Sequence, residues 1–236
     1  LATGLWLVAR QLRRMPGRSD RAALLSLPAW GALIRVNQHL FVRTLCLLGA
    51  TAYFTSQGAS FGDDVLAANA VLLQFVMMTS YALDGFAQAA ESEVGRAVGQ
   101  NDWQRFARSV GAATRFSLIT ATAASGLLWL CGPALIHLLT DIPEVRALAT
   151  VYLPWMVAMP LVAVWSYLLD GIFIGATATR EMRNTLVVSL LAFIGLWPLL
   201  EGFGNHGLWL AFLLFTSVRS AVLGGYYLHH RRHHWR

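Results

Sequence analysis

The sequence predicts an all-α membrane protein with six transmembrane helices. Of its 236 residues, 56% are hydrophobic and only 13% are charged, whereas a soluble domain carries about 25% charged residues. The mean hydropathy is +0.53. Six apolar stretches are each long enough, or nearly so, to cross a bilayer, which takes about 20 residues of helix. Arginines gather in alternate connections between these stretches, as expected for a multi-pass protein.

The apolar stretches are separated by turn-forming residues. Pro143 suits the first turn of a helix, and Asp141 just before it is a candidate N-cap. Glycines and polar residues interrupt the chain at 57–64 and 201–207. The spans expected on this basis are Leu33–Ser56, Val65–Ala90, Phe106–Leu139, Ala147–Ala176, Leu186–Leu200 and Gly207–Leu228.

The arginines predict the orientation of these spans. They lie before the first span, after the second, after the fourth and after the sixth, whereas acidic residues gather in the other connections. The positive-inside rule then places the C-terminus in the cytoplasm. We divide the chain into the end of a preceding helix and a basic linker (1–32), a six-helix lobe (33–228) and a basic tail (229–236). The chain opens on LATGLWLVA, which reads as the end of an apolar helix and predicts that sequence precedes it.

The second span carries a polar stripe on an otherwise apolar helix. Asp84 is the one charge between Ala67 and Ala90. Residues spaced by three and four positions share one face of a helix, and a carboxylate facing lipid is costly. The stripe therefore predicts the wall of a transport pathway. Its members are Gln74, Met77, Tyr81, Asp84, Gln88, Glu91 and Gly95.

Asp84 and Asp170 lie within the second and fourth apolar spans, and Arg43 and Arg219 lie within the first and sixth. Asp84 and Asp170 are candidates for a proton or cation site or for a substrate contact, and a structural hydrogen-bonding role is the alternative. Arg43 and Arg219 are expected to snorkel toward the interface. Pairing of either arginine with Asp84 or Asp170 is the second possibility, and the sequence leaves it open.

Several function classes are excluded. The net charge of +6 comes from arginines in short loops, and not from one basic surface, so we expect no nucleic-acid partner. The sequence contains no Walker loop, no GxSxG and no HExxH motif. We therefore expect neither an enzyme nor an ATP-driven pump, and no metal or organic cofactor. The four histidines from His229 to His234 show no fixed ligand spacing.

Two separated motifs resemble one family of transporters. GFAQAAESEVGRAVGQND at Gly85–Asp102 resembles the signature that follows the eighth helix of the multidrug and toxic compound extrusion (MATE) family. LLDGIFIGATATREMRN at Leu168–Asn184 is similar to the tenth-helix motif of its DNA-damage-inducible (DinF-like) branch. The stretches Asn37–Thr44 and Leu66–Leu72 fit the same branch, and the resemblance covers roughly Asn37–Leu228. The positions that carry the family signature are Gly85, Glu91, Gly95, Gly99, Gly171 and Gly175.

The resemblance implies a fold and an activity. Such proteins have twelve helices in two lobes, so this chain corresponds to the C-terminal lobe and its partner is a missing N-terminal lobe. The family exports cationic or amphipathic small molecules from the cytoplasm in exchange for protons or sodium, across the bacterial inner membrane, by alternating access. Asp170 matches an acidic position linked to cation binding in the sodium-coupled branch, but Arg43 lies on the helix that carries a second acid there.

Other functions remain possible at this point. A lipid-linked precursor flippase of the same superfamily would need a cavity rich in arginine to hold pyrophosphate, and only Arg43 and Arg219 lie at membrane depth. A membrane-embedded enzyme would need paired catalytic groups, for which only Asp84 and Asp170 are present. A membrane protein that does not transport would not need the polar stripe.

Overall fold

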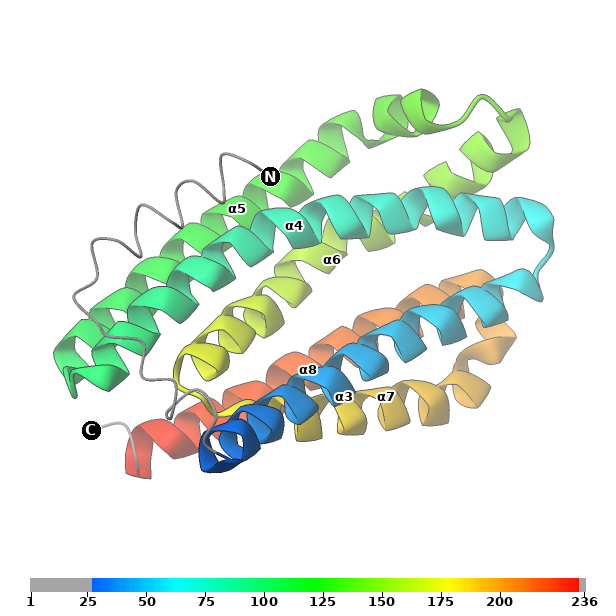
Figure 1. Cartoon of the computed structure of the whole chain (residues 1–236). Helices are drawn as coiled ribbons and strands as arrows, with labels where there is room; N and C mark the ends of the chain where they lie inside the picture. The colour runs from blue at the N-terminus through cyan, green and yellow to red at the C-terminus, as the bar shows by residue number, and fades with distance from the viewer. Residues whose placement is uncertain (1–26, 234–236) are drawn as a thin grey trace, which may run out of the picture. The chain divides into compact units, whose positions relative to one another are not determined.

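The computed structural model describes residues 27–233, and this part of the chain is helical with short connections (Figure 1). The long helices differ little in length, apart from a shorter α7. In chain order they are α3 (Leu27–Ala59), α4 (Asp63–Gly99), α5 (Trp103–Leu139), α6 (Pro143–Gly175), α7 (Thr179–Leu200) and α8 (Gly204–His233), with a 3-10 turn, η1 (Glu201–Phe203), between the last two. The predicted basic linker up to residue 26 and the last three residues of the predicted tail lie outside the described part.

The helices extend beyond the predicted apolar spans. α4 continues past Ala90 to Gly99, so the signature that begins at Gly85 is helical. Pro143 occupies the first turn of α6, as predicted. The prediction that Asp141 caps this helix is wrong, because the N-cap is Ile142 and makes no side-chain capping bond. Asp141 instead accepts a hydrogen bond from Arg146 Nη2 at 2.8 Å.

Four helical stretches in the described chain are long and apolar enough to cross a membrane. They are α4, α5, α6 and the continuous run Thr179–Arg231, which contains α7, η1 and α8. α3 is not one of them, although the first span was expected there. Its apolar character is lowered by Asn37, Gln38 and Arg43, and by Thr51 further along. The part of the chain that the structure describes is thus all-helical and contains helices of membrane length and apolarity, and the number of crossings stays a prediction.

Residues from His39 onward form one compact unit, and Leu27–Gln38 belong to a separate one. Within the larger unit α4, α5 and α6 pack on one another, α7 packs on α8, and α8 also contacts α6 (Figure 1). α6 is therefore the helix that both groups share. It carries Pro154 and Pro160 and remains helical through both.

An aromatic cluster holds α3, α7 and α8 together. Phe54 of α3 lies 4.5 Å from Trp209 of α8 and 5.1 Å from Phe212, measured between ring centroids. Phe193 of α7 packs edge-on against Phe212 at 6.0 Å. Phe54, Trp209 and Phe193 are fully buried. Aromatic pairs at these distances contribute about 0.5–1.5 kcal/mol each beyond the burial of their area.

Candidate functional site

A buried ionic cluster connects three helices. Asp170 of α6 accepts hydrogen bonds at its Oδ2 atom from Arg43 of α3, at 2.5 Å, and from Arg219 of α8. The side chains of Asp170 and Arg219 are each 5% exposed, and that of Arg43 is 21% exposed. Arg219 also lies over the ring of Tyr167, with its Cζ atom 5.6 Å from the ring centroid. One carboxylate thus holds two guanidinium groups.

The cluster does not satisfy all of its polar atoms. Asp170 Oδ1, Arg43 Nε and Arg219 Nε are buried without a hydrogen-bond partner. Burying charges is costly even when they are paired, and ionisable groups at membrane depth are rare outside functional sites. The arrangement makes the cluster a candidate functional site.

The expectation that Arg43 and Arg219 snorkel to the interface is wrong, since both point to Asp170. The physical reason is that the carboxylate of Asp170 provides both guanidinium groups with an ionic partner inside the bundle. The alternative that the sequence left open, pairing with an acid, is the one the structure shows. Both arginines pair with Asp170, and neither pairs with Asp84.

Asp84 lies beside this cluster without joining it. Its side chain is partly buried, and it is close enough to Arg43, Asp170 and Arg219 to interact electrostatically with each. In residues 27–233 the structure shows no hydrogen bond or ion pair to its carboxylate. Asp84 is therefore the acid of this region that remains available to a proton or a cation.

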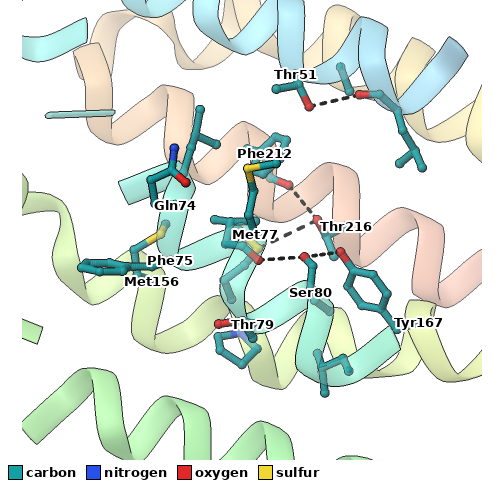
Figure 2. A pocket seen from close by; sticks show the side chains of 18 of the residues that line it. Thr51, Gln74, Phe75, Met77, Thr79, Ser80, Met156, Tyr167, Phe212 and Thr216 are labelled. Atoms are coloured by element: carbon teal, nitrogen blue, oxygen red, sulfur yellow. Dashed lines mark hydrogen bonds between the residues drawn. The ribbon is translucent and has the colours of Figure 1, made fainter. Parts of the chain in front are cut away.

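A cavity of about 430 Å³ lies next to the cluster, between α3, α4, α6 and α8. Figure 2 shows side chains from these helices turned toward it. Arg219 is the charged residue in its lining; the others are apolar or neutral and polar. The apolar part includes Met77, Met156, Met159, Phe75, Phe212 and Phe215, and the polar part includes Gln74, Ser80, Tyr81, Tyr167 and Thr216. Its volume falls within the range of about 300–1,000 Å³ that is typical of small-molecule sites.

Three hydroxyl groups in the cavity, those of Ser80, Tyr167 and Thr216, already use their protons within the protein (Figure 2). Ser80 Oγ donates to the carbonyl of Val76 at 2.7 Å, so the hydroxyl of Tyr167, 2.5 Å away, donates to Ser80. Thr216 Oγ1 donates to the carbonyl of Phe212 at 3.1 Å. Each hydroxyl oxygen keeps lone pairs as acceptors. The cavity therefore offers hydrogen-bond acceptors, thioether sulfurs and aromatic faces.

The predicted stripe on α4 divides between two surroundings. Gln74, Met77 and Tyr81 line the cavity, and Asp84 lies near the ionic cluster. Gln88, one turn further on, is exposed and does not line it. That the whole stripe faces an aqueous pathway stays a prediction.

Two of the signature glycines have a packing reason. A Cβ atom at Gly171 would collide with the backbone carbonyl of Ala87, and one at Gly175 would lie 2.5 Å from the carbonyl oxygen of Glu91. A Cβ atom at Gly95 would lie 3.4 Å from the carbonyl oxygen of Gly175, at the limit of an ordinary van der Waals contact. Small residues that allow backbones to approach are the usual device for packing membrane helices. Gly85 and Gly99 meet nothing within 4 Å, so packing does not explain them.

A buried polar network that was not predicted from the sequence joins α4 and α8. Asn69 and Asn205 exchange hydrogen bonds through their side-chain amides, at 2.7 and 2.9 Å. Trp209 Nε1 donates to the same oxygen of Asn69 at 2.9 Å. All three residues are buried. The sequence signal for this network is Asn69 itself, an asparagine inside an apolar span.

The described histidines do not form a metal site. His230 lies 3.4 Å from a carboxylate oxygen of Glu181, and His39 lies 3.2 Å from Arg183. Within residues 27–233 no three His, Cys, Asp or Glu side chains are placed to hold one ion together. His234 lies outside that range.

Membrane-length helices with a buried ionic cluster beside a cavity define the class of the chain, a helical membrane protein with an internal cavity. The MatE family model matches residues 40–199. DNA damage-inducible protein F of Escherichia coli (strain K12) is 41% identical over 204 residues, which cover 86% of this chain and 44% of the relative. The chain belongs to the MatE family.

More distant relatives are named for multidrug resistance. A probable multidrug resistance protein NorM of Xanthomonas axonopodis pv. citri is 27% identical over 205 residues, or 82% of this chain and 41% of the relative. The solved outward-facing conformation of a multidrug resistance MATE family transporter superposes with a TM-score of 0.77 at 21% identity, covering 86% of this chain and 46% of that one. The family is thus one of transporters and not of enzymes, and the chain spans less than half the length of these relatives.

Proposed function

We propose that the chain is the C-terminal lobe of a secondary antiporter that exports cationic or amphipathic compounds from a bacterial cytoplasm. In this proposal the lobe crosses the inner membrane six times, its C-terminus is cytoplasmic, and it works with an N-terminal lobe by alternating access. The carrying observation is the position of Asp84 beside the ionic cluster and the cavity, with no partner of its own in the described chain.

The cavity chemistry supports a cationic substrate with an apolar body. Aromatic faces attract cations, and methionines adapt to ligands of different shape. The hydroxyl oxygens of Ser80, Tyr167 and Thr216 have lone pairs left to accept a hydrogen bond from an ammonium group. The one charged residue of the lining, Arg219, is already paired with Asp170. An organic cation of drug size fits this combination.

The ionic cluster favours protons over sodium as the coupling ion. Asp170 Oδ2 already accepts from two guanidinium groups, so a sodium ion would have to displace an arginine to bind there. Asp84 makes no such contact. A proton and an organic cation that compete for one carboxylate give exchange, because each leaves when the other binds.

The test uses the full-length protein, both lobes together, in sealed membrane vesicles with an imposed proton gradient. The wild type is expected to export a cationic dye and to release protons in return. Asp84→Asn is expected to abolish the part of dye export that the proton gradient drives. Asp64→Asn is the matched control, because Asp64 is exposed in the first turn of the same helix. Transport and pH dependence that are unchanged by Asp84→Asn would contradict the proposal.

The flippase alternative receives no support from the cavity. A pyrophosphate group needs several cationic side chains around it, whereas Arg219 alone among the lining residues is charged. The substrate pathway is expected to lie between the lobes, so the isolated chain should not transport. Dye exchange by the purified chain in vesicles would contradict this expectation.

A further inference from the structure

The ionic cluster contains one more positive charge than Asp170 can balance. Asp170 and Arg219, each 5% exposed, form a pair that is neutral by itself. Arg43 is then the surplus cation, and its side chain, 21% exposed, is the least buried of the three. Moving Arg43 away would leave Asp170 still paired with Arg219. The bond from Arg43 is therefore the one that the cluster can lose without leaving a buried charge unpaired.

Asp84 is the acid that matches this surplus. It interacts electrostatically with Arg43 of α3, with Asp170 and Tyr167 of α6 and with Arg219 of α8. From α5 the side chains of Leu118 and Ala121 pack near the neighbouring Leu83, and both are apolar. With Asp84 ionised, two carboxylates face two guanidinium groups, but only one carboxylate holds them.

From this geometry we infer that Arg43 exchanges between Asp170 and Asp84 during transport. Arg43 pairs with Asp170 while Asp84 holds a proton or the cationic substrate, and it turns to Asp84 when that site is empty. The inference rests on the proposed function. Its content is that the guanidinium group of Arg43 pairs with Asp84 in place of the transported cation when that cation is absent.

The exchange would explain how an antiporter avoids leakage. A transporter that switched freely between its inward-facing and outward-facing states while empty would let substrate move down its concentration gradient without exchange. An Arg43–Asp84 pair gives the empty state a contact that the occupied state lacks, and a difference of this kind is what shifts a conformational equilibrium. Arg43 is in this view a positioning residue that acts through Asp84.

The first experiment does not depend on transport. Arg43→Gln, Asp84→Asn and the double variant are purified, and their melting temperatures are measured in alkaline buffer without substrate. If the two side chains pair there, the double variant should differ from the sum of the single effects by about 2–4 °C. Saturating cationic dye should remove the difference. Additive effects without dye would overturn the inference, whatever the protein transports.

The second experiment separates coupling from transport in vesicles. Arg43→Gln should lose proton-driven accumulation but keep or gain downhill dye flux, and Arg43→Lys should recover part of the coupling because the charge returns. Exchanging the two residues, Arg43→Asp with Asp84→Arg, should restore coupling relative to either single change. Arg183→Gln is the control, since Arg183 is a partly buried arginine of α7 outside the cluster.

Two results in vesicles would overturn the inference. One is an Arg43→Gln variant with full coupling, and the other is an equal fall in driven and downhill flux in a folded Arg43→Gln protein that Arg43→Lys does not rescue. If the variant with residues 43 and 84 exchanged does not fold, the melting-temperature cycle of Arg43→Gln and Asp84→Asn provides the test of the inference. A wild type that shows no proton exchange would contradict the proposed function instead, and the melting cycle would still test the pairing.

Discussion

Arg219 of α8 donates a hydrogen bond to the Oδ2 atom of Asp170 on α6, and Arg43 of α3 donates to the same atom. Asp170 is therefore the common acceptor for cations from two other helices. A change at Asp170 affects two buried charges, whereas a change at either arginine affects one.

Asp170→Asn should destabilise the protein more than Arg219→Leu does. The asparagine leaves two guanidinium groups without a counter-charge, and breaking a buried ion pair costs about 3–5 kcal/mol. Arg219→Leu leaves Asp170 paired with Arg43 and should cost less. Thermal unfolding in detergent measures both. Asp64→Asn is the control, since Asp64 is exposed in the first turn of α4 and forms no ion pair in the described chain. Equal melting temperatures for Asp170→Asn and wild type would contradict this account.

Gly171→Ala should separate α4 from α6. The new Cβ atom would overlap the carbonyl group of Ala87, which is backbone and has no way to rotate aside. We expect a large fall in melting temperature and poor expression. Gly85→Ala is the matched control on α4, because nothing lies within 4 Å of a Cβ atom there. There we expect no loss of stability, since alanine favours a helix over glycine by about 1 kcal/mol. A Gly171→Ala variant as stable as Gly85→Ala would refute the packing argument.

Asn69→Leu should weaken the contact between α4 and α8. It removes the acceptor of Trp209 and both hydrogen bonds of Asn205, and a buried polar group left unpaired costs about 1–3 kcal/mol. Chemical unfolding of the purified protein measures the loss. Ser117→Ala is the control, since the buried hydroxyl of Ser117 has no hydrogen-bond partner to lose. If both variants were equally stable, the amide network would carry no stabilising role.

Ala70→Trp should obstruct the cavity. Ala70 is exposed and lines the cavity, so a large side chain there reaches the open space without disturbing the buried core. We expect weaker binding of a fluorescent organic cation, measured by titration of the purified full-length protein. Ala82→Trp is the control, because Ala82 is exposed on the same helix but does not line the cavity. Unchanged dye affinity in Ala70→Trp would place the substrate elsewhere.

Local features of the sequence predicted the helical membrane class and the family. Long apolar stretches give helices because the backbone needs internal hydrogen bonds in lipid. α5 and α6 follow the expected spans closely, and α4 begins where expected but continues to Gly99. The resemblance of Gly85–Asp102 and Leu168–Asn184 led to the family that the comparisons show. Asp170 was also found from sequence, since one carboxylate in an apolar span is conspicuous.

The sequence does not show which side chains far apart in the chain pair with one another. Arg43 and Arg219 lie 127 and 49 positions from Asp170, and no helical spacing connects them. The reciprocal amides of Asn69 and Asn205, 136 positions apart, were missed for the same reason. For both arginines the sequence left two alternatives open, the membrane interface and a buried acid, and the structure shows the second.

The sequence by itself determined that the chain is a bundle of membrane helices with acids on the second and fourth spans, because hydrophobicity and helical period act over neighbouring residues. Only the tertiary structure decided that Asp170 is held in ion pairs and that Asp84, within the described residues, is not. Charges at membrane depth pair with the nearest opposite charge in space, and helix packing sets that distance, here through the glycines that bring α6 against α4.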